Sequence, residues 1–130
     1  MELIREASIP TLSNSGVESR QLLFPENSAS ERITITRVMM PPEITNPLHN
    51  HTSSEQVWVA LEGEGTLLLA GGETVPFSAG DVARFSEGEM HGFTNTGEVP
   101  FVYISVTSPP INFRGVYSKI WESGSGSTRI

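Results

Sequence analysis

Along most of the chain, apolar and polar residues alternate or form short apolar runs, without the three-and-four spacing of an amphipathic helix. Alternation with a period of two is typical of β-strands, because successive side chains of a strand point to opposite faces. The pattern predicts a series of strands, with the apolar segment Leu3–Ile9 as a weaker candidate. The stronger candidates are Arg20–Phe24, Arg32–Met40, Gln56–Leu61, Gly65–Ala70, Val82–Phe85, His91–Asn95 and Phe101–Thr107.

Residues that favour turns separate these segments. Pro41-Pro42 cannot continue a central strand, because proline has no N–H to donate, and Gly71-Gly72 is a short hairpin connection. Many short strands with no helices between them predict a β-sandwich or barrel. A chain of 130 residues is expected to form one domain. We assign that domain to residues 1–122 and interpret the Ser- and Gly-rich residues 123–130 as a flexible tail.

Charge and composition narrow the classes of function. The chain has 15 acidic and 8 basic residues, and a net charge of −7 argues against binding to nucleic acids or to anionic membranes. Cysteine is absent, which excludes disulfides, cysteine zinc sites, iron–sulfur clusters and thiol catalysis. No apolar run has the length of a transmembrane helix, and the N-terminus lacks the apolar region of a signal peptide. We therefore expect a cytoplasmic protein whose partner is a small-molecule substrate.

The chain has 3 histidines, and two of them are spaced for metal binding. On a strand, His49 and His51 point to the same face, so both imidazoles can reach one point. Glu55 and Gln56 follow where the next predicted strand begins, and either side chain can add an oxygen ligand. His91 lies at the start of another predicted strand. The sequence therefore predicts one divalent metal ion per chain, and these donors suit Fe, Ni, Mn, Co, Cu or Zn.

Two motifs around these histidines resemble those of the cupin superfamily. The first reads H-x-H-x4-Q-x6-G over residues 49–63, and the second reads G-x5-S-x-G-x2-H-x3-N over residues 80–95. Ser86 stands where the family usually has proline. The resemblance implies a small single-domain cupin of the RmlC-like superfamily, with an all-β fold, an antiparallel jelly-roll barrel. It also implies that His49, His51 and His91 bind the metal together with a fourth ligand.

The fourth ligand is either Glu55 or Gln56, and the spacing from His51 leaves both open. The cupin family keeps a gap of six residues before the glycine that is Gly63 here, and this resemblance favours Gln56. The choice affects the chemistry. A neutral amide leaves the full 2+ charge on the ion and makes it a stronger Lewis acid, whereas a carboxylate would cancel one unit of charge.

Four residues are expected to line a substrate pocket beside the metal. Trp58 and Phe93 each lie two residues from a ligand on the same strand, so each should face the same side as that ligand. Arg37 is a candidate to hold a substrate carboxylate, because a buried arginine needs a partner. Met39 is a candidate for the floor of the pocket. Which face of each strand points inward is left open by the pattern.

These features favour a metal-dependent enzyme that acts on a small oxygenated organic molecule by non-redox Lewis-acid chemistry, as a lyase, isomerase or cyclase. An Fe(II)-dependent dioxygenase is the alternative, and a non-catalytic cupin that binds a small ligand or sugar is a second alternative. The neutral Gln56 favours non-redox chemistry. A proton must also be moved in such a reaction, and Tyr103 is the first candidate for this catalytic role, with Glu55 the second.

The protein is also expected to form a homodimer. Leu3–Ile9 is apolar and has no obvious partner in its own sheet, and an unpaired edge strand tends to pair with another chain. In cupins such a segment often adds to the sheet of a neighbour. Further apolar side chains near the C-terminus would also need cover. They are Phe113, Tyr117, Ile120 and Trp121.

Overall fold

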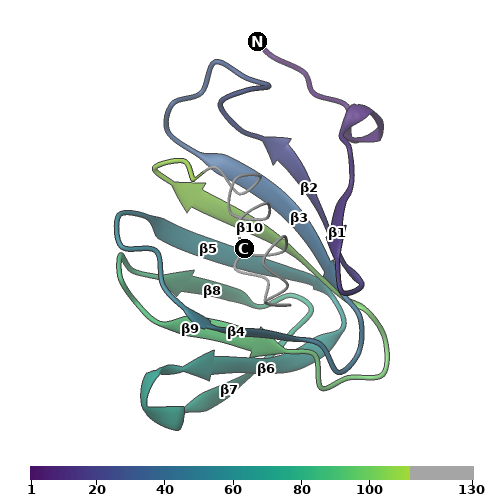
Figure 1. Cartoon of the computed structure of the whole chain (residues 1–130), viewed down its shortest axis with the longest axis vertical. Coiled ribbons are helices and arrows are strands. Elements are labelled where there is room, and N and C mark those ends of the chain that lie inside the picture. Colours follow the sequence, from purple (N-terminus) through teal and green to yellow (C-terminus); the bar gives the residue numbers. More distant parts are fainter. Residues whose placement is uncertain (112–130) are drawn as a thin grey trace.

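The computed structural model of the chain describes residues 1–111, which form strands joined by turns and by two short 3-10 helices, η1 (Glu6–Ser8) and η2 (Ala70–Gly72). Figure 1 shows the strands arranged in two layers. The strands are β1 (Leu12–Asn14), β2 (Val17–Leu23), β3 (Thr34–Met40), β4 (Thr45–His49), β5 (Glu55–Glu62), β6 (Glu64–Leu69), β7 (Thr74–Ser78), β8 (Val82–Phe85), β9 (His91–Thr94) and β10 (Phe101–Ser108).

The strands form two antiparallel sheets. One has six strands in the order β1-β2-β3-β10-β5-β8, and the other has four in the order β4-β9-β6-β7. The chain crosses between the sheets several times, so strands that are neighbours in space are often distant in sequence (Figure 1). This confirms the predicted all-β antiparallel jelly roll. Within residues 1–111, no helix has the length and apolar character needed to cross a membrane.

Alternating burial along the strands defines the inside of the sandwich. In β3, Thr34, Thr36, Val38 and Met40 are buried, while the side chains between them are partly exposed. Strand β10, which pairs with β3, alternates in the same way. Aromatic side chains fill one end of the interior, where Phe93 stacks on Phe101 at 4.2 Å between ring centroids. The face of each strand that points inward is therefore known, and with it the set of side chains that can reach a common site.

Three strands in the structure, β1, β4 and β7, are not predicted from the sequence. Each lies at an edge of its sheet. Pro47 in β4 and Pro76 in β7 argue against strands in a sequence analysis, but proline is tolerated on an edge strand, where its missing N–H faces away from the ladder. The edge position explains why the hydrophobic pattern missed these strands.

The prediction of a strand at Leu3–Ile9 is wrong. The segment contains η1 and joins neither sheet. The segment is attached to its own chain instead, since the Glu6 carboxylate accepts a hydrogen bond from Nε of Arg37 at 2.7 Å. The C-terminal apolar residues named above and the tail 123–130 lie outside the described residues. The homodimer stays a prediction, which light scattering on the purified protein would check.

Candidate metal centre

Three histidines converge at one end of the four-stranded sheet. His49 is the last residue of β4, His91 is the first of β9, and the two are directly paired in the antiparallel register. Ring centroids are 4.5 Å apart for His49 and His91, 5.1 Å for His49 and His51, and 5.5 Å for His51 and His91. One ligand atom from each ring lies within 4.8 Å of the other two. The structure thus brings together all three predicted nitrogen ligands.

Gly92 allows β9 to lie unusually close to β4 beside this cluster. A Cβ atom at this position would be 2.6 Å from the carbonyl oxygen of Asn46 and 2.9 Å from the carbonyl carbon of Pro47. Any larger residue would therefore push the two strands apart. Because Gly92 directly follows His91, this contact sets how closely the His91 and His49 rings approach. The sequence pattern alone does not distinguish this glycine from those in turns.

The side chain of Gln56 reaches the same point from the six-stranded sheet. Its Nε2 donates a hydrogen bond to Thr107 Oγ1 at 2.9 Å, and its Oε1 accepts one from Trp58 Nε1 at 2.8 Å. An indole N–H can only donate, so the amide oxygen and not the nitrogen must face Trp58. The same oxygen lies 3.1 Å from Nε2 of His91. The amide is therefore fixed with its oxygen toward the imidazole cluster.

His91 faces an oxygen acceptor at each ring nitrogen. Its Nδ1 lies 2.9 Å from the carbonyl oxygen of Glu89, and its Nε2 lies 3.1 Å from Gln56 Oε1. Neither oxygen can donate a hydrogen bond. A neutral imidazole has one N–H, so whichever nitrogen carries it, the other directs a lone pair at an oxygen lone pair. A cation beside Nε2 removes this conflict, and so does a second proton on the ring.

Burial disfavours the second proton. It lowers the pKa of His91 to about 4, against the opposing effects of the Glu89 carbonyl and carboxylate. Burial also lowers the pKa of His51 to about 4, and the neighbouring His49 lowers it further. Both rings are therefore neutral at pH 7, which is the form that binds metal ions. A cation bound by both His91 Nε2 and Gln56 Oε1 removes the conflict without that proton.

The surroundings of the imidazoles also fit a metal ion. Metal-binding histidines usually donate their second N–H to a carbonyl or carboxylate, which holds the ring in place. Nδ1 of His91 lies 2.9 Å from the carbonyl oxygen of Glu89, and Nδ1 of His49 lies 2.8 Å from that of Pro47, so both rings have the partner for this N–H. Phe85 stacks on His91 at 4.0 Å, with an angle of 5° between the planes. Three imidazole nitrogens and one amide oxygen form a donor set suited to a divalent transition-metal ion.

Metal-free protein is expected to lose stability as the pH falls from 7 to 5. The pKa of His91 is about 4 in the folded chain and about 6.5 in an unfolded one, so in this range only the unfolded state gains the proton. His91 alone should then cost about 2 kcal/mol of the free energy of unfolding at pH 5. Urea denaturation with a chelator present measures this. A His91→Phe variant should show a smaller loss, and an equal loss would contradict the assignment.

Comparisons with known proteins identify the family of the chain. The sequence matches the family described as Cupin domain over residues 36–107. The chain belongs to the cupin family. Among curated proteins, no sequence matches this chain significantly.

Solved structures of other proteins share the fold. A predicted oxalate decarboxylase from Thermotoga maritima is 28% identical, with a TM-score of 0.71 over 84% of this chain and 100% of that one. Ectoine synthase from P. lautus is 19% identical, with a TM-score of 0.77 over 92% of this chain and 86% of that one. The polyketide cyclase RemF from Streptomyces resistomycificus is 21% identical, with a TM-score of 0.72 over 85% and 80%. At such identities the last two establish the fold alone.

In this cupin, Glu55 points away from the histidines. It precedes Gln56 on β5, so the two side chains lie on opposite faces of the sheet. The Glu55 carboxylate accepts hydrogen bonds from Nε and Nη2 of Arg84 at 2.9 and 2.6 Å on the outer surface. Glu55 was predicted as the alternative ligand and as the second catalytic candidate. Its position on the outer face of β5 is incompatible with both roles. Gln56 is the oxygen donor that the structure brings to the cluster.

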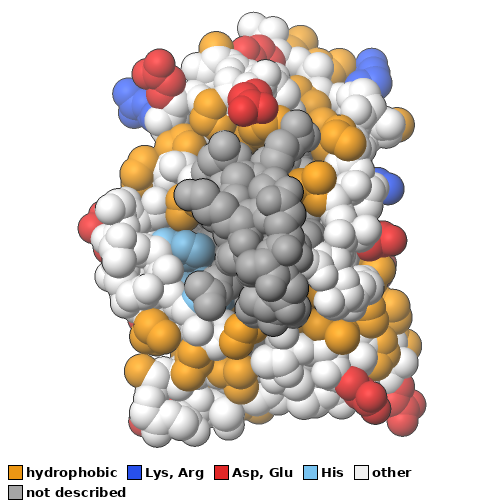
Figure 2. Space-filling model, in the orientation of Figure 1, with side chains coloured by type: hydrophobic (Ala, Val, Ile, Leu, Met, Phe, Trp, Pro, Cys, Tyr) orange, Lys and Arg blue, Asp and Glu red, His pale blue; other side chains and the backbone are white. Residues whose placement is uncertain are grey.

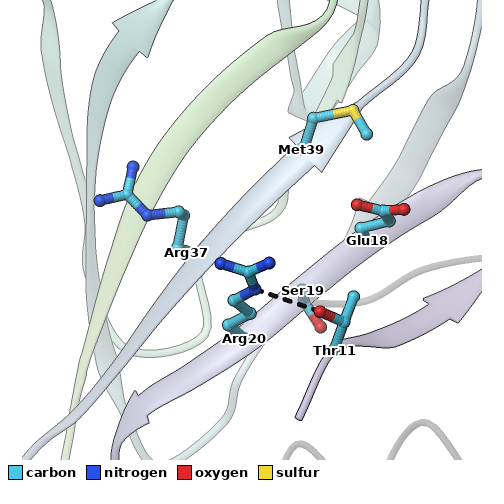
Figure 3. Close-up of a pocket in the computed structure, with 6 residues that line it drawn as sticks. All are labelled: Thr11, Glu18, Ser19, Arg20, Arg37 and Met39. Carbon is cyan, nitrogen blue, oxygen red and sulfur yellow. Dashed lines mark hydrogen bonds between the residues drawn. The ribbon is translucent and has the colours of Figure 1, made fainter. Parts of the chain in front are cut away.

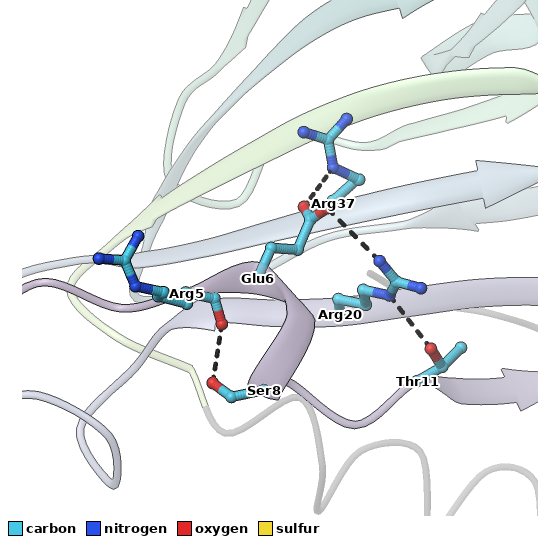
Figure 4. A network of polar contacts seen from close by, with 6 residues as sticks. All are labelled: Arg5, Glu6, Ser8, Thr11, Arg20 and Arg37. Atoms are coloured by element: carbon cyan, nitrogen blue, oxygen red, sulfur yellow. Dashed lines mark hydrogen bonds and ion pairs between the residues drawn. The ribbon is translucent and has the colours of Figure 1, made fainter.

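Arg37 and Met39 also face outward, contrary to the prediction that they line the pocket. They alternate on β3 with buried residues, and Figure 3 shows both in a small hollow on the outer face of the sheet. Nε of Arg37 donates to the Glu6 carboxylate at 2.7 Å, and Nη1 of Arg20 lies 3.4 Å from the same group (Figure 4). Neither Arg37 nor Met39 can contact a molecule bound at the histidines.

Trp58, Phe93 and Tyr103 are fully buried. Trp58 meets His91 edge-on at 5.4 Å and contacts Tyr103 at 4.6 Å between ring centroids. Tyr103 therefore lies one ring farther from the histidines than Trp58. Phe93 shares the face of His91 but packs into the aromatic core against Phe101. Of these residues, Trp58 touches the candidate centre, through both His91 and Gln56.

The site of this cupin is accessible beside His51. A pocket of about 360 Å³ is lined by residues 50–54 and 109–111. Ser54 Oγ donates a hydrogen bond to the carbonyl oxygen of Pro109 at 2.8 Å, which joins the loop after β4 to the end of β10. Figure 2 shows histidine side chains, in pale blue, reaching the molecular surface on this side. A small molecule can thus approach the imidazoles from solvent.

Proposed function

We propose that this cupin is a metal-dependent enzyme that acts on a small oxygenated organic molecule by non-redox Lewis-acid chemistry, of the lyase, isomerase or cyclase type. The observation that carries the proposal is the neutral donor set. Three imidazoles and the Gln56 amide oxygen face one point, and Trp58 prevents the amide from turning its nitrogen there. A divalent ion bound by these residues supplies a Lewis acid that polarises a carbonyl or hydroxyl oxygen of the substrate.

The protein's own residues prepare this chemistry. The backbone carbonyls of Pro47 and Glu89 hold the rings of His49 and His91 in fixed orientations. Phe85 and Trp58 cover the His91 ring and exclude water from it. An environment of low polarity strengthens every electrostatic interaction with the substrate oxygen. The pocket beside His51, of about 360 Å³, has room for a small molecule next to this imidazole.

Tyr103 is the candidate for proton transfer in this proposal. Burial raises the pKa of its hydroxyl well above the usual value, while the Asn46 side chain opposes the shift. The phenol therefore stays protonated near neutral pH and can donate a proton or hydrogen bond, but cannot act as a base. The name of the Thermotoga maritima relative, a predicted oxalate decarboxylase, also describes lyase chemistry.

The proposal is tested by loading the purified protein with Fe(II), Co(II), Ni(II) or Mn(II) and incubating it in D₂O with a panel of small hydroxyketones and hydroxy acids. Proton NMR would follow deuterium exchange next to the carbonyl and product formation. We expect turnover without oxygen and with more than one metal. Oxygen consumption restricted to the Fe(II) protein would support a dioxygenase instead. Metal binding without exchange or turnover would support a non-catalytic binding protein.

A further inference from the structure

A group of uncharged polar side chains covers part of the inner face of the six-stranded sheet. We call it the polar wall; it consists of Ser19 and Gln21 on β2, Thr34 and Thr36 on β3, and Ser105 on β10. Each of these side chains is at most 2% exposed. Residues of this kind are mostly found on protein surfaces. Their gathering on the inside of a small sandwich therefore needs an explanation.

Strand register connects the polar wall to the candidate metal centre. Gln21 pairs with Thr36, Thr36 with Ser105, and Ser105 with Trp58, so one row crosses four strands. In a second row, Thr34 pairs with Thr107, and Thr107 pairs with Gln56. Both rows therefore end at the two residues of β5 that contact His91. The wall therefore adjoins the candidate site within the six-stranded sheet.

The polar atoms of the wall have no hydrogen-bond partner within residues 1–111. This holds for the hydroxyl oxygens of the Ser and Thr residues and for both amide atoms of Gln21. A buried polar atom without a partner costs free energy, so native structures keep few of them without a reason. Thr107 is a useful contrast, because it lies in the same sheet and its hydroxyl accepts a hydrogen bond from Gln56.

We propose that the polar wall is a substrate-recognition surface, and that it selects an uncharged molecule with several hydroxyl groups. This inference rests on the proposed function, in which an oxygen at one end of the substrate lies at the imidazoles. Hydroxyl and amide groups both donate and accept hydrogen bonds, so they match the hydroxyl groups of a ligand. The wall carries no charge, and Arg37 lies on the other face of β3, so within residues 1–111 no cation of β3 neutralises a carboxylate or phosphate there.

Two ligands with the same carbon skeleton test the proposal. Erythrulose and 1-hydroxy-2-butanone share a hydroxyketone end, but only erythrulose has hydroxyl groups on the other two carbons. Calorimetry on the Co(II)-loaded protein would measure affinity, and the visible spectrum of Co(II) would report contact with the metal. We expect erythrulose to bind at least about tenfold more tightly, since each matched hydroxyl group contributes severalfold.

Variants of the wall supply the second readout. Thr36→Val and Ser105→Ala should each weaken erythrulose binding by about fivefold and leave the affinity for 1-hydroxy-2-butanone unchanged. Thr36→Val should also raise the melting temperature without ligand, because it removes a buried hydroxyl that has no partner. Thr107→Val, the matched control, should lower the melting temperature, because it breaks the hydrogen bond to Gln56. A lower melting temperature for Thr36→Val would overturn the proposal.

Ligand affinity and the Co(II) spectrum together distinguish recognition by the polar wall from the proposed Lewis-acid function. Equal affinity for both ketones, with a change in the Co(II) spectrum, would show that the wall does not select hydroxyl groups and would leave the proposed function standing. Preferential binding of erythrulose without a spectral change would support the wall and overturn the Lewis-acid function. Absence of binding by either ketone would overturn the wall as a recognition surface for hydroxylated substrates.

Discussion

Replacing His91 by alanine is expected to lower the affinity for Zn(II) or Co(II) by at least about 100-fold. His91 supplies one nitrogen of the donor set and also fixes the distance to the Gln56 oxygen at 3.1 Å. Phe85 and Trp58 pack against its ring, so no neighbouring side chain can take its place. Competition with a chromogenic chelator would measure the affinity, and metal analysis after gel filtration would measure the stoichiometry.

Glu55→Ala is the matched control for this experiment. The Glu55 carboxylate binds Arg84 on the outer face, so its removal should leave one metal ion per chain with unchanged affinity. Circular dichroism should show the same strand content for both variants. Full stoichiometric binding by His91→Ala, or loss of metal from Glu55→Ala, would show that the centre is assembled from other residues.

Gly65→Ala is expected to destabilise the fold by about 3 kcal/mol, because it inserts a methyl group where the sheet leaves no room. Gly65 lies in β6 beside β9. A Cβ atom there would overlap the ring of Phe93 and lie 2.5 Å from the carbonyl oxygen of Thr94. Relief would require either the core ring or the β6–β9 pairing to move. Guanidinium denaturation would measure the change in the free energy of unfolding.

Gly71→Ala is the control for this variant, because it introduces backbone strain without crowding. Gly71 has a φ of 75°, and a Cβ atom there would meet nothing within 4 Å. Its replacement should cost only about 1 kcal/mol, the penalty of a left-handed conformation. Similar losses for the two variants would mean that the core around Phe93 adapts easily, against the tight packing described here.

Much of the fold follows from the sequence because buried strands carry strong alternation. The hydrophobic pattern fails for edge strands, and it does not decide which face of a strand is buried. Edge strands such as β4 tolerate proline, so a rule that identifies central strands misses them. In β3, both faces carry apolar and polar residues, and alternation alone does not tell which face is inside. This is why Arg37 and Met39 were expected in the pocket, whereas Thr34 and Thr36 line the interior.

The candidate site was predicted more completely than its surroundings. The spacing of His49, His51 and His91 indicates a common point before any coordinates are known, because the two motifs fix their strands. The choice of Gln56 over Glu55 needed the register of β5, which strand alternation in the structure provides. The roles of Thr107 and Phe85 depend on contacts between strands distant in sequence, and no local pattern contains that information.

The donors of the candidate centre belong to different layers of the sandwich. His49 and His91 lie in the four-stranded sheet, whereas Gln56 lies in the six-stranded sheet. An ion held by all of them is a cross-link between the layers, so its binding energy adds to the free energy that holds the layers together. The melting temperature should therefore rise with the concentration of free metal. A simple thermal melt then becomes an assay of how fully a preparation is loaded.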